Sequence, residues 1–120
     1  MGKPIIRPAT REDIDAFSSM QNKPTAKAVC MIIDGRIVAL GGFARVKSRW
    51  FAFCDLTEEA RPYKMHIART AKRMLDEIKG HGIRFIYAQA NPDEPGAVRW
   101  LTSLGFVEDR RADRLYRWRA

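Results

Sequence analysis

Apolar side chains recur at helical spacing in two stretches of this chain. The first predicts a helix that begins near Pro62, stops at Gly80 and Gly82, and has an apolar face formed by Ile67, Ala71, Met74, Leu75 and Ile78. The second has an apolar face formed by Ala97, Trp100, Leu101 and Leu104. Gly105 follows directly and favours the left-handed conformation that ends helices. This helix is therefore expected to end at Leu104, with Phe106 folding back on its last turn.

A shorter helix is predicted near the N-terminus, after an extended piece at residues 4–7. Thr10 and Asp13 form a variant of the capping box, and the apolar residues Ile14, Phe17 and Met20 follow at helical spacing. The next segment, QNKPTA at residues 21–26, is expected to be a loop because a proline and small polar residues interrupt the pattern. A second helix at this point of the chain is therefore expected to be short or absent.

The remaining apolar stretches have the lengths and the alternation of strands. Asp34-Gly35 is a strong signal for a hairpin between strands at residues 28–33 and 37–46. Within the second of these strands, Gly41-Gly42 indicates a β-bulge or a close approach of two backbones. Further strands are predicted at residues 50–56, 83–90, 106–107 and 115–119.

The predicted order is strand, helix, three strands, helix, strand, helix and two strands. The strand–helix–strand unit in the middle implies one parallel pair inside an otherwise antiparallel sheet. A chain of 120 residues can bury a single core. We therefore expect one α/β domain over residues 1–120, with a mixed, mostly antiparallel central sheet and helices on both faces.

The charge of the chain adds an expectation about its partner. Lys and Arg number 22 against 14 Asp and Glu, which gives a net charge of +8. A phosphate-rich cofactor, a nucleic acid or an anionic surface would each suit this charge, which also serves solubility. Cys30 and Cys54 lie in apolar stretches and are expected to be buried free thiols. No apolar stretch is long enough for a membrane span or a signal peptide, so we expect a cytoplasmic protein that does not bind membranes.

The order of elements, together with GAVRWLTSLGFVEDR at residues 96–110, resembles the GNAT superfamily of acetyl-CoA-dependent N-acetyltransferases. In that family a segment of the type N-x-x-A-x-x-F-Y-x-x-x-G-F closes the cofactor site. Its positions are occupied here by Ala97, Trp100, Leu101, Gly105 and Phe106. The resemblance covers nearly the whole chain. It implies direct transfer of an acetyl group from acetyl-CoA to an amine, with the phosphates near the start of the helix that follows strand 50–56.

Carried onto this sequence, the resemblance implies that coenzyme A is bound by Leu56, Thr57, Tyr63, Lys64, Met65, His66, Ile67, Arg69, Asn91, Ala97, Trp100 and Leu101. One departure concerns the phosphate loop, where Met65 and Ile67 stand in place of the family's glycines. A β-branched residue is strained where glycine adopts positive φ, so the loop is expected to differ in shape. Phosphate binding would then rest more on Lys64 and Arg69.

Two other departures affect the chemistry. Glu94 replaces an asparagine and cannot donate the same hydrogen bond, although Asn91 lies three positions earlier. Leu101 replaces the tyrosine that protonates the departing thiolate in many members, so water or another residue would have to act. Direct transfer also requires a base for the incoming ammonium. Asp55 and Glu58 are the expected bases, although both also suit structural roles at a helix start.

Other functions suit parts of the sequence. The arginines near the C-terminus, interleaved with Tyr116 and Trp118, would suit a nucleic-acid binder. Alternation along a strand places these two rings opposite the arginines, so only nonspecific nucleic-acid binding is expected. The three departures instead suit a GNAT-like binding or structural module without catalysis. An open acceptor side suits a macromolecular amine or a pocket shared in a homodimer. His66 and His81 are too far apart in sequence to predict a metal site.

Overall fold

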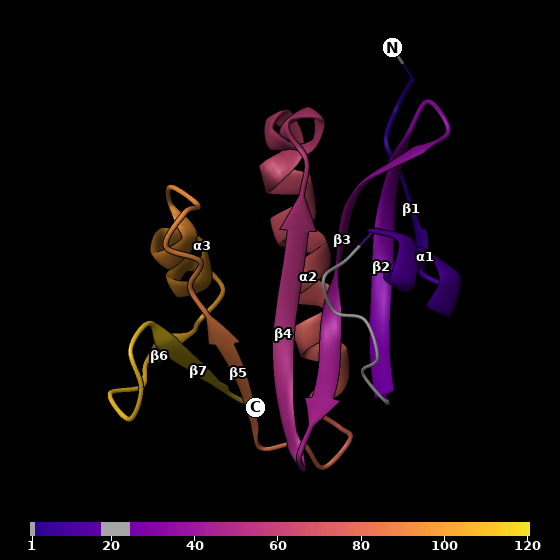
Figure 1. Cartoon of the computed structure of the whole chain (residues 1–120). Coiled ribbons are helices and arrows are strands. Elements are labelled where there is room, and N and C mark those ends of the chain that lie inside the picture. The colour runs from indigo at the N-terminus through magenta and orange to yellow at the C-terminus, as the bar shows by residue number, and fades with distance from the viewer. Residues whose placement is uncertain (1, 18–24) are drawn as a thin grey trace.

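Seven strands form one sheet within residues 2–17 and 25–120, the part of the chain that the computed structural model describes (Figure 1). The strand order is β1-β2-β3-β4-β5-β7-β6, and every pair is antiparallel except β4 with β5. The strands are β1 Ile5–Pro8, β2 Thr25–Ile33, β3 Arg36–Val46, β4 Arg49–Leu56, β5 Phe85–Gln89, β6 Val107–Glu108 and β7 Leu115–Arg119. The predicted mixed, mostly antiparallel sheet is confirmed.

Helices cover both faces of this sheet, as the sequence predicts. On one face, α2 (Lys64–Ile78) and α3 (Ala97–Ser103) pack into a shared apolar cluster with β5 and β7. On the other face, α1 (Arg11–Phe17) packs Ile14 against β2 and β3. In the view of Figure 1, α2 lies behind β3 and β4. Among the helices that the structure describes, none is long and apolar enough to cross a membrane.

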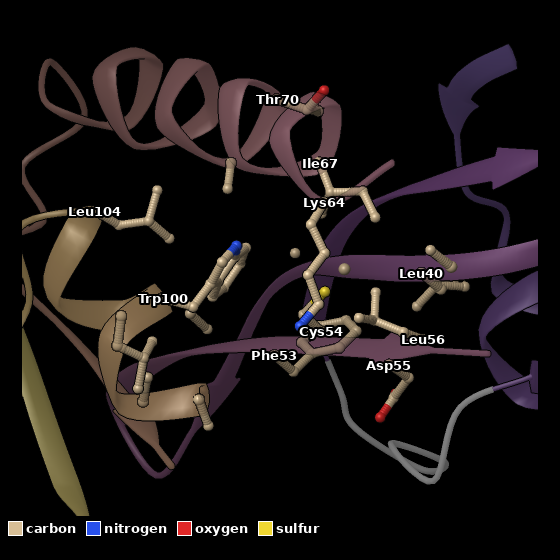
Figure 2. A pocket seen from close by; sticks show the side chains of 18 of the residues that line it. Leu40, Phe53, Cys54, Asp55, Leu56, Lys64, Ile67, Thr70, Trp100 and Leu104 are labelled. Carbon is tan, nitrogen blue, oxygen red and sulfur yellow. The ribbon is translucent and has the colours of Figure 1, made fainter. Parts of the chain in front are cut away.

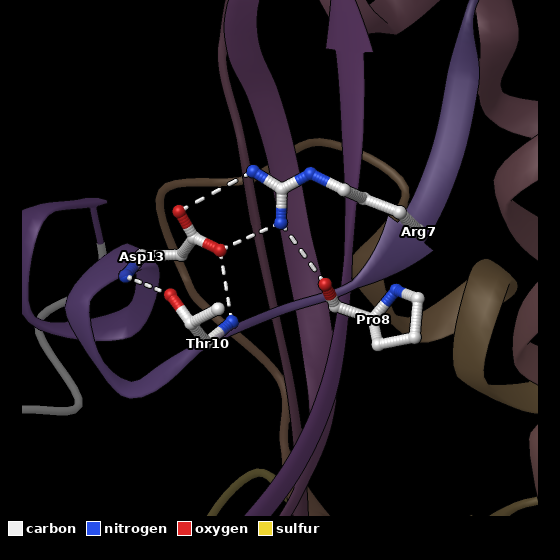
Figure 3. A network of polar contacts seen from close by, with 4 residues as sticks. All are labelled: Arg7, Pro8, Thr10 and Asp13. Atoms are coloured by element: carbon white, nitrogen blue, oxygen red, sulfur yellow. Dashed lines mark hydrogen bonds and ion pairs between the residues drawn. The ribbon is translucent and has the colours of Figure 1, made fainter.

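The start of α1 carries the predicted capping box. The Asp13 backbone N–H donates to Thr10 Oγ1 (3.1 Å), and the Thr10 backbone N–H donates to Asp13 Oδ2 (2.8 Å), as Figure 3 shows. The Arg7 guanidinium at the end of β1 also donates to Asp13 Oδ2 at 2.8 Å. These bonds favour the carboxylate and hold the pKa of Asp13 well below its usual value, with the Arg7 bond as the largest cause. The network joins β1 to α1.

The glycine pair of β3 marks a close approach of two backbones. A Cβ atom on Gly42 would lie 2.1 Å from the carbonyl oxygen of Lys27 in β2, whereas one on Gly41 would lie 3.1 Å from its nearest neighbour, the carbonyl oxygen of Phe53. The irregularity in the β2–β3 pairing lies between Met31 and Ile32. Of the two interpretations left open by the sequence, the close approach is the one that the structure bears out.

The end of α3 has the geometry expected from its glycine. Gly105 adopts φ +98°, its N–H donates to the carbonyl of Thr102, and the Phe106 N–H donates to the carbonyl of Leu101. This pair of bonds is the Schellman motif, which satisfies carbonyl groups of the last turn. Phe106 is buried in the cluster shared by α2 and α3, so the glycine sets the angle at which the chain leaves α3.

Some boundaries differ from those predicted. Residues 25 and 26, expected in a loop, begin β2, because they pair with the end of β3. The expected loop residues 21–24 and the helical position of Met20 lie outside the described residues. A 3₁₀ turn, η1 (Glu58–Tyr63), precedes α2, so the α-helix begins at Lys64 rather than near Pro62.

Candidate active site

The parallel pair β4–β5 opens into a cleft. Within the described residues, β4 pairs with β5 at Trp50 and Phe51, whereas it pairs with β3 along its whole length, as far as Leu56. Figure 1 shows the two strands diverging from their common end. The Thr57 N–H donates to the carbonyl of Val38 in β3 at 2.9 Å. Because backbone groups of an antiparallel strand alternate in direction, those of Ala52, Cys54 and Leu56 point away from β3, into the gap left by β5.

This cleft has a volume of about 310 Å³ and is walled by β3, β4, α2, α3 and the loop after β5. That volume lies within the range of small-molecule sites. Figure 2 shows the Lys64 side chain extending from α2 toward β4, and the Trp100 ring extending from α3 into the cleft. Consecutive residues of β4, from Ala52 to Leu56, all line it. This stretch of β4 is an open strand edge, so its backbone groups line the cleft together with its side chains.

Cys54 is reachable from the cleft and is not the buried thiol that the sequence predicts. Cys30 is buried as expected, but Cys54 is exposed because β5 has turned away from this part of β4. Protein still surrounds the thiol on its other sides. This desolvation raises the pKa of Cys54 to about 12, and the charges of Asp55 and Glu94 act in the same direction. The thiol is therefore protonated at neutral pH and is a poor nucleophile.

An ion-pair bridge crosses one end of the cleft. Arg61 in η1 donates to both carboxylate oxygens of Glu94, at 2.9 and 3.1 Å, and Lys64 Nζ lies 3.8 Å from the same carboxylate. Glu94 lies in the loop between β5 and α3, so the bridge joins the start of α2 to the start of α3. Hydrogen bonds from Arg61 to Glu94 and Glu58 raise the pKa of the guanidinium. The acidic residue that replaces the family's asparagine thus neutralises cations at the helix start.

The structure brings together about half of the residues expected to bind coenzyme A. The cleft is lined by Leu56, Lys64, Ile67, Asn91, Ala97, Trp100 and Leu101. Thr57 lies beside it, but its N–H and hydroxyl both donate to the carbonyl of Val38. Tyr63, the last residue of η1, packs against an apolar cluster formed with β2 and β3, and Met65, His66 and Arg69 are exposed on α2 without lining the cleft. The roles assigned to these residues remain predictions.

The segment in place of the family's glycine loop is helical. Positive φ does not occur at any residue from 57 to 70, and Ile67 occupies a regular position of α2 that faces the cleft. The loop therefore differs in shape, as the β-branched side chain requires, and Ile67 is unstrained.

The two expected bases occupy different positions. Asp55 lines the cleft, and Figure 2 shows its carboxylate on the side of β4 that faces away from α2. Glu58 lies outside the cleft, with its side chain 86% exposed and 3.0 Å from Arg61. Sequence analysis placed Cys54 in the core, although it alternates along β4 with Leu56, which was assigned to the site. That alternation is the signal that could have placed Cys54 in the cleft.

In the GNAT acyltransferase fold, a parallel pair of strands opens beside an unpaired strand edge. A helix leads from one strand of this pair to the other. The chain has this fold. Along 98% of its length it is similar to the ribosomal-protein-S18-alanine N-acetyltransferase from Escherichia coli, with a TM-score of 0.71, 13% identity and 94% of that chain covered. A GNAT-family acetyltransferase from Staphylococcus aureus Mu50 gives a TM-score of 0.72, with 15% identity over 98% of this chain and 99% of that one.

An IAA acetyltransferase from Bacillus cereus ATCC 14579 gives a TM-score of 0.68, with 8% identity over 98% of this chain and 100% of that one. No family model matches the sequence, and no curated protein matches it. At these identities the likeness establishes the fold and leaves the reaction to the geometry of the cleft.

Proposed function

We propose that this protein is an N-acetyltransferase that transfers an acetyl group from acetyl-CoA directly to an amine. The observation that carries the proposal is the open edge of β4, where the backbone groups of Ala52, Cys54 and Leu56 face a cleft. An extended chain that carries amide groups can bind such an edge as an additional strand. The pantetheine arm of coenzyme A is a chain of this kind.

The residues of the cleft fit such a ligand. Trp100, Leu101 and Leu104 give the α3 wall an apolar surface for the arm, and Lys64 supplies a cation at the start of α2. The 3₁₀ turn η1 runs directly into this helix, and the Lys64 N–H already donates to the carbonyl of Arg61. Phosphate binding at this end of the cleft would therefore rest on the Lys64 side chain. Glu94 opposes phosphate binding because it already pairs with Lys64 and Arg61. We therefore expect acetyl-CoA to bind more weakly than the net charge of the chain suggests.

In the proposed reaction the amine approaches from the face of β4 that carries Asp55. The Asp55 carboxylate accepts a proton from the ammonium, and the neutral nitrogen attacks the thioester carbonyl carbon. The new C–N bond forms as the C–S bond breaks, and the thiolate leaves with the electron pair of that bond. The acylated nitrogen loses its second proton to water, and water gives a proton to the thiolate, so that the products are the neutral amide and the thiol. Leu101 has no proton to give at the position where the family has tyrosine. Because general-acid help is typically worth about 10² to 10⁴-fold in rate, turnover is expected to be slow.

The binding half of the proposal is tested by calorimetric titration with acetyl-CoA and, separately, with desulfo-coenzyme A. Lys64→Ala is expected to weaken binding about fivefold to tenfold, as the loss of roughly 1 kcal/mol of charge attraction implies. Lys72→Ala is the matched control, because Lys72 is an exposed lysine of the same helix that does not line the cleft. Failure of both ligands to bind at millimolar concentration would overturn the proposed function. Equal weakening by the two variants would show attraction to net charge rather than to the cleft.

A GNAT-fold binding module without catalysis is the second candidate function. Leu101 and Glu94 favour it, since neither can perform the role of the family residue that it replaces. Release of thiol from acetyl-CoA in the presence of a panel of amines separates the two candidates. Turnover that disappears with Asp55→Asn supports the enzyme. Binding of acetyl-CoA without thiol release with any amine supports the module.

A further inference from the structure

Three aromatic rings lie together on the sheet face opposite α2 and α3. Tyr87 lies between Ile86 and Ala88, whose side chains join the core beneath those helices, so the Tyr87 side chain points to the other face. Its ring centroid lies 5.8 Å from that of Phe51 in β4 and 6.5 Å from that of Phe85 in β5. Phe51 and Phe85 are only partly buried.

Arginine side chains cover these rings. The guanidinium carbon of Arg49 lies 5.5 Å from the centroid of Tyr87, and that of Arg111 lies 5.7 Å from it. The guanidinium carbon of Arg117 in β7 lies 5.0 Å from the centroid of Phe85. Guanidinium groups at these distances interact with the ring faces as cation–π pairs. We call the set formed by Phe51, Phe85, Tyr87, Arg49, Arg111 and Arg117 the arginine–aromatic face.

The charge of this face is positive. Arg111 is compensated by Asp109, whose side chain is 4% exposed and accepts bonds of 3.0 Å from Arg111 Nε and 2.6 Å from Nη2. No described carboxylate forms an ion pair with Arg49 or Arg117, although Arg117 lies near enough for its charge to act on Asp109. Both guanidinium groups lie over aromatic rings and keep N–H donors that can bind a carboxylate.

The arginine–aromatic face lies on the same face of the sheet as Asp55. Arg49, Phe51, Phe53 and Asp55 alternate along β4 and therefore share one face. Phe53 packs in the same cluster as Ile14 of α1, which places this row opposite α2. At about 3.3 Å per residue, Asp55 lies roughly 20 Å from Arg49 along the strand. An extended polypeptide covers that distance with about six residues.

We propose that the arginine–aromatic face docks an acidic polypeptide segment, and that this segment delivers an aliphatic amine to Asp55 at the cleft. The delivery step rests on the proposed function, whereas the docking step does not. Carboxylates match the bidentate geometry of guanidinium groups, and lysine side chains and N-termini are aliphatic amines. Guanidinium groups already lie over Tyr87 and Phe85, which disfavours the use of these rings as platforms for nucleobases. The acidic residues of the segment are expected about six positions from the amine.

Docking is tested by fluorescence anisotropy with a labelled short peptide that has a free N-terminal amine and acidic residues about six positions further on. Its controls are the same peptide with lysines in place of the acidic residues and a single-stranded oligothymidylate. Arg49→Gln combined with Arg117→Gln is expected to weaken binding of the acidic peptide about tenfold at roughly 0.05 M salt. Arg73→Gln combined with Arg99→Gln removes the same charge from exposed positions on α2 and α3, and is expected to change binding less than about twofold. Thermal unfolding checks that both double variants are folded.

Each result has a definite consequence. Equal weakening by the two double variants, or equal binding of the acidic and lysine peptides, overturns docking on this face. If the oligothymidylate binds more tightly than the acidic peptide, and only the Arg49→Gln, Arg117→Gln variant loses this binding, then the face binds nucleic acid and not a polypeptide. Acetyl-CoA calorimetry on the same samples separates the proposals. Peptide docking without acetyl-CoA binding refutes the proposed function and leaves docking intact, whereas acetyl-CoA binding with no peptide docking refutes only the docking of an acidic segment on the arginine–aromatic face.

Discussion

Replacing Glu94 with glutamine keeps the size of the side chain and removes a negative charge from the end of the cleft. Two unit charges about 4 Å apart interact by about 1 kcal/mol in bulk water and by about 4 kcal/mol near a protein surface. The Glu94 side chain is 29% exposed, and it pairs with Lys64 across 3.8 Å. Taking the lower value for this accessible site, Glu94→Gln is expected to lower the Kd of acetyl-CoA about fivefold. The variant frees Lys64 and Arg61 for phosphate.

Glu58 provides the matched control, because it also pairs with Arg61, at 3.0 Å, but lies outside the cleft with its side chain 86% exposed. Glu58→Gln removes the same charge from the same arginine and is expected to change the Kd less than about twofold. Both are measured by calorimetry at low and high salt. The gain from Glu94→Gln should shrink as salt screens the charges. The reasoning that Glu94 competes with phosphate would be refuted by an unchanged or higher Kd of acetyl-CoA for Glu94→Gln. It would also be refuted if Glu58→Gln lowered this Kd by the same factor.

The packing and titration of individual residues give further predictions. Gly42→Ala is expected to destabilise the fold by at least about 2 kcal/mol more than Gly41→Ala in urea unfolding, because only at Gly42 would a Cβ overlap backbone atoms of the neighbouring strand; equal effects would contradict the close approach. Hydrogen bonds from Arg111 lower the pKa of Asp109, so its stabilising effect is present above the ordinary carboxyl pKa and is lost as pH falls below about 4. Asp109→Asn should therefore flatten the decline of stability between about pH 5 and pH 2, unlike Asp113→Asn in the same turn, and parallel curves for wild type and Asp109→Asn would count against it. With a thiol pKa of about 12, Cys54 should react with iodoacetamide at about pH 8 at least roughly 100-fold more slowly than free cysteine, and labelling at the rate of the free amino acid would disprove the desolvation.

The local pattern of the sequence determined the type of each element and several of its caps and turns. The spacing of Thr10 and Asp13 predicts the capping box that the structure contains, because a cap depends on residues within one turn. Asp34-Gly35 predicts the hairpin, whose turn needs positive φ at both positions. Gly105 predicts the left-handed end of α3. Each of these features is decided by neighbours in the chain, so the sequence alone sufficed.

The divergence of β4 from β5 was decided by the tertiary structure. An apolar stretch from Trp50 to Leu56 indicates a strand, but it carries no sign that the neighbouring strand departs after Phe51. Cys54 was therefore expected in the core, and only the opening of the pair brings it to a cleft wall. Whether a β-strand side chain is buried depends on what packs against its face, which is set by segments distant in sequence.

The arginine–aromatic face also depends partly on the local sequence and partly on the tertiary structure. Alternation along β7 correctly separates Arg117 from Tyr116 and Trp118, both of which are buried in the core beneath α2 and α3. The rings that accompany the arginines come instead from β4 and β5, and strand order and register place them there. The sequence assigns each side chain to one side of its own strand. Which side chains of other strands share that side is determined by the assembled sheet, because the pairing of strands joins residues far apart in the chain.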